Sequence, residues 1–314
     1  MNKMILAAVL ITSAVNVSAQ TSSVKLNATQ DPTQVPAQES VIKLKEVTGN
    51  KKFEEDKDIT DSKIKADAGS LSRYSLKFSL SYFGPPVGDL SNKKQPNPDG
   101  SIGSFDTALQ GAMSGRYRLS KQSAISVGTG IGARTPFHGT EQVDVKNPFI
   151  GIDRTGRLGE LQMRNQISFE GATVPEYREV GQWGTIDYKG SLVYNFGTTP
   201  WAAGVDTSIN YFMYEREYET KDRSAGRYTV AFYPEVKYNL SDKLNFYTSL
   251  AVKFINPRQR DNEWDMLNRT LSQRLGLGYA FTRDVYFAPN LNFYPNDPNM
   301  DSTTISFATI FSIL

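Results

Sequence analysis

Residues 73–83 read RYSLKFSLSYF, and this stretch decides the fold. Its even positions from Tyr74 to Tyr82 are aromatic residues or leucine, and its odd positions from Ser75 to Ser81 are serine or lysine. Successive side chains of a β-strand point to opposite faces, so this alternation predicts a strand with one apolar and one polar face.

The same alternation recurs along the rest of the chain. The clearest repeats are residues 187–196, 201–213, 228–240, 244–254 and 271–281. Further spans that fit are 106–119, 123–133, 145–153, 159–171, 284–294 and 303–314. The clearest strands run over roughly 11 to 16 residues, which exceeds the usual globular strand and suits a tilted strand that crosses a membrane.

The connections between these strands alternate in length. Tight turns are expected at 120–122, 156–158, 197–200, 241–242 and 282–283. Longer polar loops are expected at 84–105, 134–144, 173–180, 216–224, 256–265 and 295–302. Short turns at one end and long loops at the other are typical of outer-membrane barrels. We therefore predict an all-β fold, a closed antiparallel transmembrane β-barrel of about 12 strands, or of ten if residues 145–171 form a loop instead of a hairpin.

The sheet must close into a barrel because hydrocarbon surrounds it. An unpaired backbone N–H or C=O group in hydrocarbon costs several kcal/mol, so a sheet in a membrane has no free edge. The apolar face would then contact lipid and the polar face would line the lumen. The alternative is a water-soluble β-sandwich with the apolar face inside. Strand length, turn asymmetry and the N-terminal signal favour the barrel over this alternative.

The chain is expected to have three parts. Residues 1–19 have the features of a signal peptide, with Lys3, an apolar run over 4–15 and small residues before cleavage after Ala19. Residues 20–72 contain one aromatic residue, Phe53, and many charges, so we expect a disordered, flexible periplasmic arm in which 42–47 or 59–68 forms a transient helix. Residues 73–314 are the barrel.

Composition excludes several chemistries. The chain has no cysteine and one histidine, His138, so disulfides, thiolate metal sites and paired imidazoles are excluded. His138 lies in an expected loop, and Asp297, Asn299 and Asp301 have only part of a calcium-loop pattern. We predict no catalytic, metal or cofactor-binding residue. Gly128, Gly130 and Gly132 recur at period two and are expected to leave space on the lumen side of one strand.

Charged residues on the inward face are the candidate lumen lining. If they pair with one another, the lumen is a closed, plugged core; if they do not, it is a wet path with a weak preference for anions. The candidates are Lys77, Arg116, Arg118, Arg164, Glu170, Asp187, Lys189, Asp206, Glu235, Lys237, Lys253 and Arg274.

Residues 73–314 resemble Gram-negative outer-membrane β-barrel proteins of the solute-channel and small-barrel kinds. The segment Asn147-Pro148-Phe149-Ile150-Gly151-Ile152 with residues 161–169 is similar to a hairpin of barrels linked to uptake of aromatic or hydrophobic compounds. The last strand, ending Ile310-Phe311-Ser312-Ile313-Leu314, is similar to the C-terminal assembly signal, although it ends in leucine instead of phenylalanine.

The favoured function is a narrow channel or transporter for small solutes, without catalysis. The alternatives are a structural or adhesive barrel with a closed lumen and partner-binding outer loops, and a membrane-embedded hydrolase. Expected partners are outer-membrane lipids and lipopolysaccharide, the barrel-assembly machinery and a small solute, and not nucleic acid, since the net charge is only +2. The expected location is the outer membrane, with the arm and the C-terminus in the periplasm.

Overall fold

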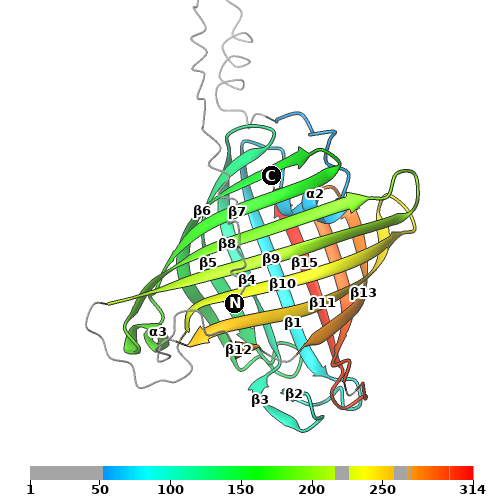
Figure 1. Cartoon of the computed structure of the whole chain (residues 1–314). Helices are drawn as coiled ribbons and strands as arrows, with labels where there is room; N and C mark the ends of the chain where they lie inside the picture. Colours follow the sequence, from blue (N-terminus) through cyan, green and yellow to red (C-terminus); the bar gives the residue numbers. More distant parts are fainter. Residues whose placement is uncertain (1–51, 216–225, 258–266, 269–270, 297, 314) are drawn as a thin grey trace, which may run out of the picture. The chain divides into compact units, whose positions relative to one another are not determined.

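The computed structural model describes residues 52–215, 226–257, 267–268, 271–296 and 298–313. The predicted signal peptide and residues 20–51 lie outside them. Twelve antiparallel strands in this part of the chain form one closed barrel (Figure 1). The strands are β1 (Tyr74–Pro86), β4 (Ala108–Arg118), β5 (Ser123–Arg134), β6 (Gln142–Leu158), β7 (Leu161–Gly171), β8 (Gln182–Asn195), β9 (Trp201–Tyr214), β10 (Gly226–Asn239), β11 (Leu244–Pro257), β13 (Ser272–Thr282), β14 (Val285–Phe293) and β15 (Thr304–Ile313).

Two pairings complete the ring of strands. The first and last strands, β1 and β15, pair in a register that places Phe78 opposite Phe311. The remaining junction is between β10 and β11, where Lys237 lies opposite Tyr247. Each of the twelve strands therefore has a neighbour on both sides, as the cost of an open edge in hydrocarbon requires. The predicted closed barrel of twelve strands is confirmed.

The hairpin of residues 145–171, on which the strand count depends, is present. Strands β6 and β7 pair continuously from Phe149 opposite Glu170 to Leu158 opposite Leu161, which rules out the ten-strand alternative. The predicted turn at 156–158 is wrong in position, because the turn lies at Gly159 and Glu160. Gly159 has a φ of 58°, a conformation that glycine adopts without steric cost.

The two ends of the barrel differ. The turns after β4, β6, β8, β10 and β13 lie at one end, here called the turn end. The other end, the loop end, carries the longer connections, with the hairpin of β2 (Lys94–Pro96) and β3 (Ile102–Asp106), the helix α3 (Pro175–Glu179) and the short strand β12 (Leu267–Asn268). The asymmetry predicted from the sequence is confirmed for the described connections.

The outer surface of the barrel is apolar. Large hydrophobic side chains on its strands are exposed, among them Val127 at 58%, Ile150 at 52% and Ile167 at 54%. In water such a surface is unfavourable, whereas lipid tails solvate it. No helix in the described ranges is long and apolar enough to cross a membrane.

Candidate functional site in the lumen

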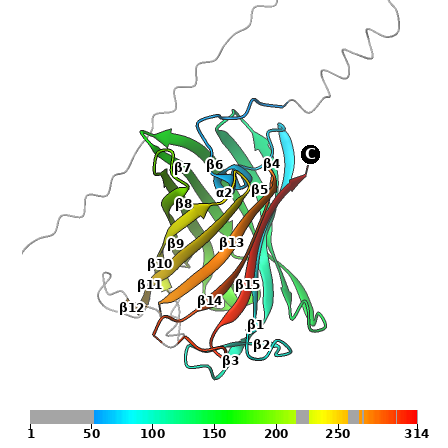
Figure 2. The ribbon, with the colours of Figure 1, turned by 90° about the vertical axis from the view of Figure 1, so that its right-hand side faces the viewer.

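Residues 52–72, here called the plug segment, lie at the turn end, where the first part of the segment runs over the rim of the barrel and its helix enters the lumen (Figures 1 and 2). The segment contains the helix α2 (Ser62–Ala68). Asp61 caps the start of this helix by accepting a hydrogen bond from the Ile64 amide at 2.9 Å. Gly69 ends it with a φ of 69°.

The helix α2 packs on the barrel wall through small apolar contacts. Ile64 is buried in a cluster with Ile59 of the plug segment and with Val193 and Ala202 of the wall. Ala66 is fully buried in a second cluster, formed with Ala280, Tyr286, Ala288 and Ile310. An isolated helix of this length is not stable in water, so the wall supplies most of what holds it.

A first group of charges, called cluster A, joins the plug segment to β9 and β10. The Lys63 ammonium lies 2.5 Å from Asp206 and 3.6 Å from Glu235. The Lys237 ammonium lies 2.9 Å from both Asp61 and Glu235. Burial would lower the pKa of Lys63, but the charges of Asp206 and Glu235 outweigh it and raise this pKa well above its ordinary value. Lys63 therefore remains charged and paired.

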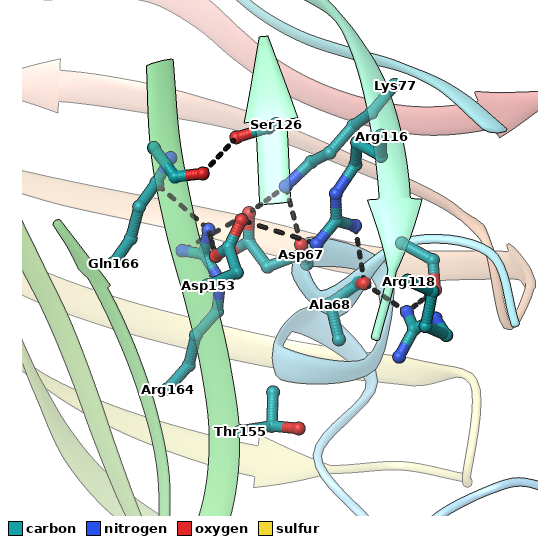
Figure 3. A network of polar contacts seen from close by, with 12 residues as sticks. Asp67, Ala68, Lys77, Arg116, Arg118, Ser126, Asp153, Thr155, Arg164 and Gln166 are labelled. Carbon is teal, nitrogen blue, oxygen red and sulfur yellow. Dashed lines mark hydrogen bonds and ion pairs between the residues drawn. The ribbon is translucent and has the colours of Figure 1, made fainter. Parts of the chain in front are cut away.

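A second group, called cluster B, joins the plug segment to β1, β4, β6 and β7 (Figure 3). The Lys77 ammonium lies 3.3 Å from the Asp67 carboxylate, and an Arg164 nitrogen lies 3.8 Å from it. The Asp153 carboxylate accepts hydrogen bonds from Arg116 at 3.3 Å and from Arg164. Cluster B thus holds three basic and two acidic side chains.

The position of the plug segment differs from the flexible arm expected over 20–72. The structure places the helix of residues 62–68, which falls inside the predicted range 59–68, against the barrel wall. The sequence predicts a solvated arm because several of its charges have partners far away in the sequence, such as Lys237 for Asp61 and Asp206 for Lys63. The expectation for residues 20–51 lies outside the described residues.

Two adjoining cavities lead from the loop end toward the plug segment. The outer one, of about 450 Å³, is lined by loop-end residues that include Phe105, Asp106 and Arg134. The inner one, of about 470 Å³, reaches Asp67 of α2. Gln110 and Lys146 line both. The cavities therefore lie on the loop side of the plug segment, and the inner one ends at Asp67.

Most of the predicted lumen candidates lie in the two charge clusters or on the inner cavity. Lys77, Arg116 and Arg164 belong to cluster B, whereas Asp206, Glu235 and Lys237 belong to cluster A. Arg118 donates to the plug segment, and Glu170, Asp187 and Lys189 line the inner cavity. Arg274 lies 5.7 Å from the ring centre of Tyr233, and Lys253 lies opposite Ala231 on β11.

Sequence reasoning missed Asp153 and Lys146. Asp153 stood at the end of an expected strand, in phase with Gly151 and Phe149, so the same alternation places it inward. Lys146 lies over the glycines of β5, because a Cβ added at Gly130 or Gly132 would meet its side chain at 2.9 or 3.0 Å. Gly130 and Gly132 thus leave space that Lys146 takes in part, whereas a Cβ at Gly128 would clash with the Met113 carbonyl oxygen of the neighbouring strand.

The other motifs remain in loops. The Nε2 atom of His138 lies 2.8 Å from the Leu90 carbonyl oxygen, which joins two loop-end connections. Asn299 accepts a hydrogen bond from the Ser302 amide at 2.7 Å, as expected for a turn. Asp297 lies outside the described residues. In the part of the chain that is described, no three acidic or histidine side chains are arranged to hold a metal ion.

A closed antiparallel barrel with an apolar exterior, short turns at one end and a polar, partly hollow lumen defines an outer-membrane β-barrel of the porin-like kind. No protein-family model matches the chain, and no curated protein matches it in sequence.

The barrel is similar in structure to several outer-membrane proteins. An outer membrane channel from Pseudomonas putida F1 has a TM-score of 0.48 and 12% identity, covering 79% of this chain and 98% of its own. The NanC porin has a TM-score of 0.42 and 10% identity, covering 76% and 100%. OmpF of Salmonella typhi in complex with daunomycin has a TM-score of 0.37 and 8% identity, covering 79% and 98%. These likenesses assign no solute to this chain.

Proposed function

We propose that the protein is a narrow outer-membrane channel for small solutes, without catalysis, whose lumen is closed at the turn end by its own plug segment. The observation that carries this proposal is the inner cavity, which is lined by polar side chains and has Asp67 of the plug segment on its lining. A volume of about 470 Å³ falls in the range of about 300–1,000 Å³ usual for small-molecule sites. A barrel built only as a scaffold has no need of such a space.

The orientation of the barrel follows from its connections. Barrels of this class have short turns on the periplasmic side and long loops outside the cell. The plug segment and the end of β15 would then face the periplasm, and the two cavities would open to the exterior. Solutes would enter at the loop end and pass the plug segment only when it moves.

Conductance in a planar bilayer tests the proposal. Removal of residues 20–72 should leave the barrel able to insert, since the twelve strands pair without that segment. We expect the truncated barrel to conduct at least about tenfold more than the full chain, because a water-filled lumen replaces a closed one. Different migration of unboiled and boiled samples on a detergent gel serves as the folding control.

The second candidate is a structural or adhesive barrel with a permanently closed lumen. The pairing of the plug segment with both charge clusters favours it, since a fixed plug would have the same contacts. A full-length chain that folds and inserts but conducts in none of the small solutes tested, while the truncated barrel conducts, would support this candidate and reject the channel.

A further inference from the structure

The end of α2 lies among basic side chains of the wall. The Ala68 carbonyl oxygen accepts hydrogen bonds from Arg116 at 2.5 Å and from Arg118 at 2.6 Å. The Gly69 carbonyl oxygen accepts from Arg283 at 2.7 Å, and that of Ser70 from Arg118 at 2.8 Å. The Ala68 oxygen belongs to the last turn of α2 and carries the negative end of its dipole, so the wall here holds the plug segment as it would hold an anion (Figure 3).

Asp67 is the charged part of this contact. Its carboxylate pairs with Lys77 and Arg164 and also lines the inner cavity, so it lies where the ion-pair cluster meets the hollow lumen. Its side chain is 16% exposed, whereas that of Asp153, the other acidic group of cluster B, is 5% exposed. A solute in the cavity would therefore meet Asp67 before any other acidic group of cluster B.

The charge balance of cluster B depends on Asp67. With it, Lys77, Arg116 and Arg164 face Asp67 and Asp153, a balance of one positive charge. Without it, three buried basic groups face Asp153 alone. Leaving such charges unpaired is costly, so another anion is needed in its place whenever the plug segment leaves.

Protonation does not readily release Asp67. Burial opposes its ionisation, but the charges of Arg164, Lys77 and Lys63 outweigh burial and hold the pKa of Asp67 at about 2. Near neutral pH the carboxylate stays charged. The contact is then broken by competition with another anion.

We propose that Lys77, Arg116 and Arg164 form a binding site for a small oxyanion, a carboxylate or a phosphate, which Asp67 occupies when the lumen is closed, and that an anionic solute displaces Asp67 and releases the plug segment. This inference rests on the proposed channel function and names its substrate class. Guanidinium groups suit carboxylate and phosphate, because their fixed N–H donors match the oxygens of both. Access is from the loop end, along the cavities that Lys146 and Lys189 line.

The test follows the burial of Ala66 in the full-length chain. Ala66 is fully buried when α2 is docked, and the chain has no cysteine, so Ala66→Cys gives a single reporter thiol. Labelling by a membrane-impermeant maleimide is measured at pH 7 in detergent with sodium phosphate, sodium succinate or sodium chloride at equal ionic strength. We expect phosphate and succinate to raise the rate about tenfold over chloride, which lacks the paired oxygens. Equal rates in all three salts would overturn the proposal.

Two variants assign the effect to cluster B. In the Lys77→Gln background the ratio of the phosphate rate to the chloride rate should fall to about one, since a ligand of the site is lost. Lys93→Gln, which removes an exposed ion pair with Glu141, should keep the full ratio. A Lys77→Gln variant that keeps it would reject this site. If Ala66→Cys does not fold, Ala68→Cys reports on the same helix and decides by the same ratio.

A further labelling experiment, with lipopolysaccharide, distinguishes a free anion from a lipid phosphate. Lipopolysaccharide carries phosphate groups, but it contacts the outside of a barrel. Adding it in place of free phosphate should leave the labelling rate unchanged, and an equal increase would overturn the lumen site. Failure of this inference is separable from failure of the channel, because labelling requires no conduction and the truncated barrel requires no anion site.

Discussion

Asp67 is a single carboxylate that holds the plug segment to cluster B. Because its pKa is about 2 in the docked state and ordinarily near 3.8, the ionised group stabilises docking. A lowered pKa contributes stability that is fully present above the ordinary value and is lost as the pH falls through the docked value. The pKa of Asp61 is lowered too, since the pairing with Lys237 outweighs its burial, so it acts in the same direction.

The full-length channel should therefore stay closed between pH 7 and pH 4 and open as the pH falls toward 2. Conductance in a planar bilayer at pH 7, 4 and 2 measures this, with gel migration as a control that the barrel is intact. Asp67→Asn should conduct already at neutral pH, because its ion pairs are absent at every pH. Opening of the wild type between pH 7 and 5 would assign the closure to other groups.

The helix α2 is the element that closes the lumen in the proposed channel. Proline in a helix interior costs about 3 kcal/mol, whereas proline at the first helical position is tolerated. Ser62 is the first residue of α2, and Ala66 lies in its last turn against the wall. The two positions thus give a matched pair of substitutions in one short element.

We expect Ala66→Pro to shift the docked plug segment toward release by about a hundredfold, the equivalent of about 3 kcal/mol, and to raise conductance. Ser62→Pro should behave as the wild type. Both are measured in the same bilayer assay at neutral pH. If Ala66→Pro is as closed as Ser62→Pro, then α2 is not the element that blocks the lumen.

The strands were predictable from sequence and the plug segment was not. Alternation from Tyr74 to Tyr82 sets both the strand and its faces, because a strand has a strict period of two. The position of the tight turn was less well determined, since Gly156 and Gly159 are both suited to it. The docking of α2 depends on pairs such as Lys63 with Asp206, which join residues 143 positions apart and leave no local signal.

Basic side chains are distributed unevenly in the molecule as a whole. The inward charged residues expected from the sequence include more basic than acidic groups. Asp153 and Lys146 add one acidic and one basic group, so the excess of basic groups is unchanged. At the turn end Arg116, Arg118 and Arg283 contact the plug segment through its carbonyl oxygens. Removing the plug segment exposes these groups to the lumen, together with Lys77 and Arg164.

The barrel that lacks residues 20–72 should therefore prefer anions. In a confined lumen these charges act over distances comparable with the Debye length of about 8 Å at physiological salt, so they are not fully screened. The reversal potential across a potassium chloride gradient measures the preference. Arg116→Glu with Arg118→Glu in the same truncated barrel should shift the potential toward cations, whereas Lys93→Gln at the loop end should change it little. Cation selectivity of the unsubstituted truncated barrel, or no shift in the double variant, would show that the turn-end arginines hold the plug segment but do not select the solute.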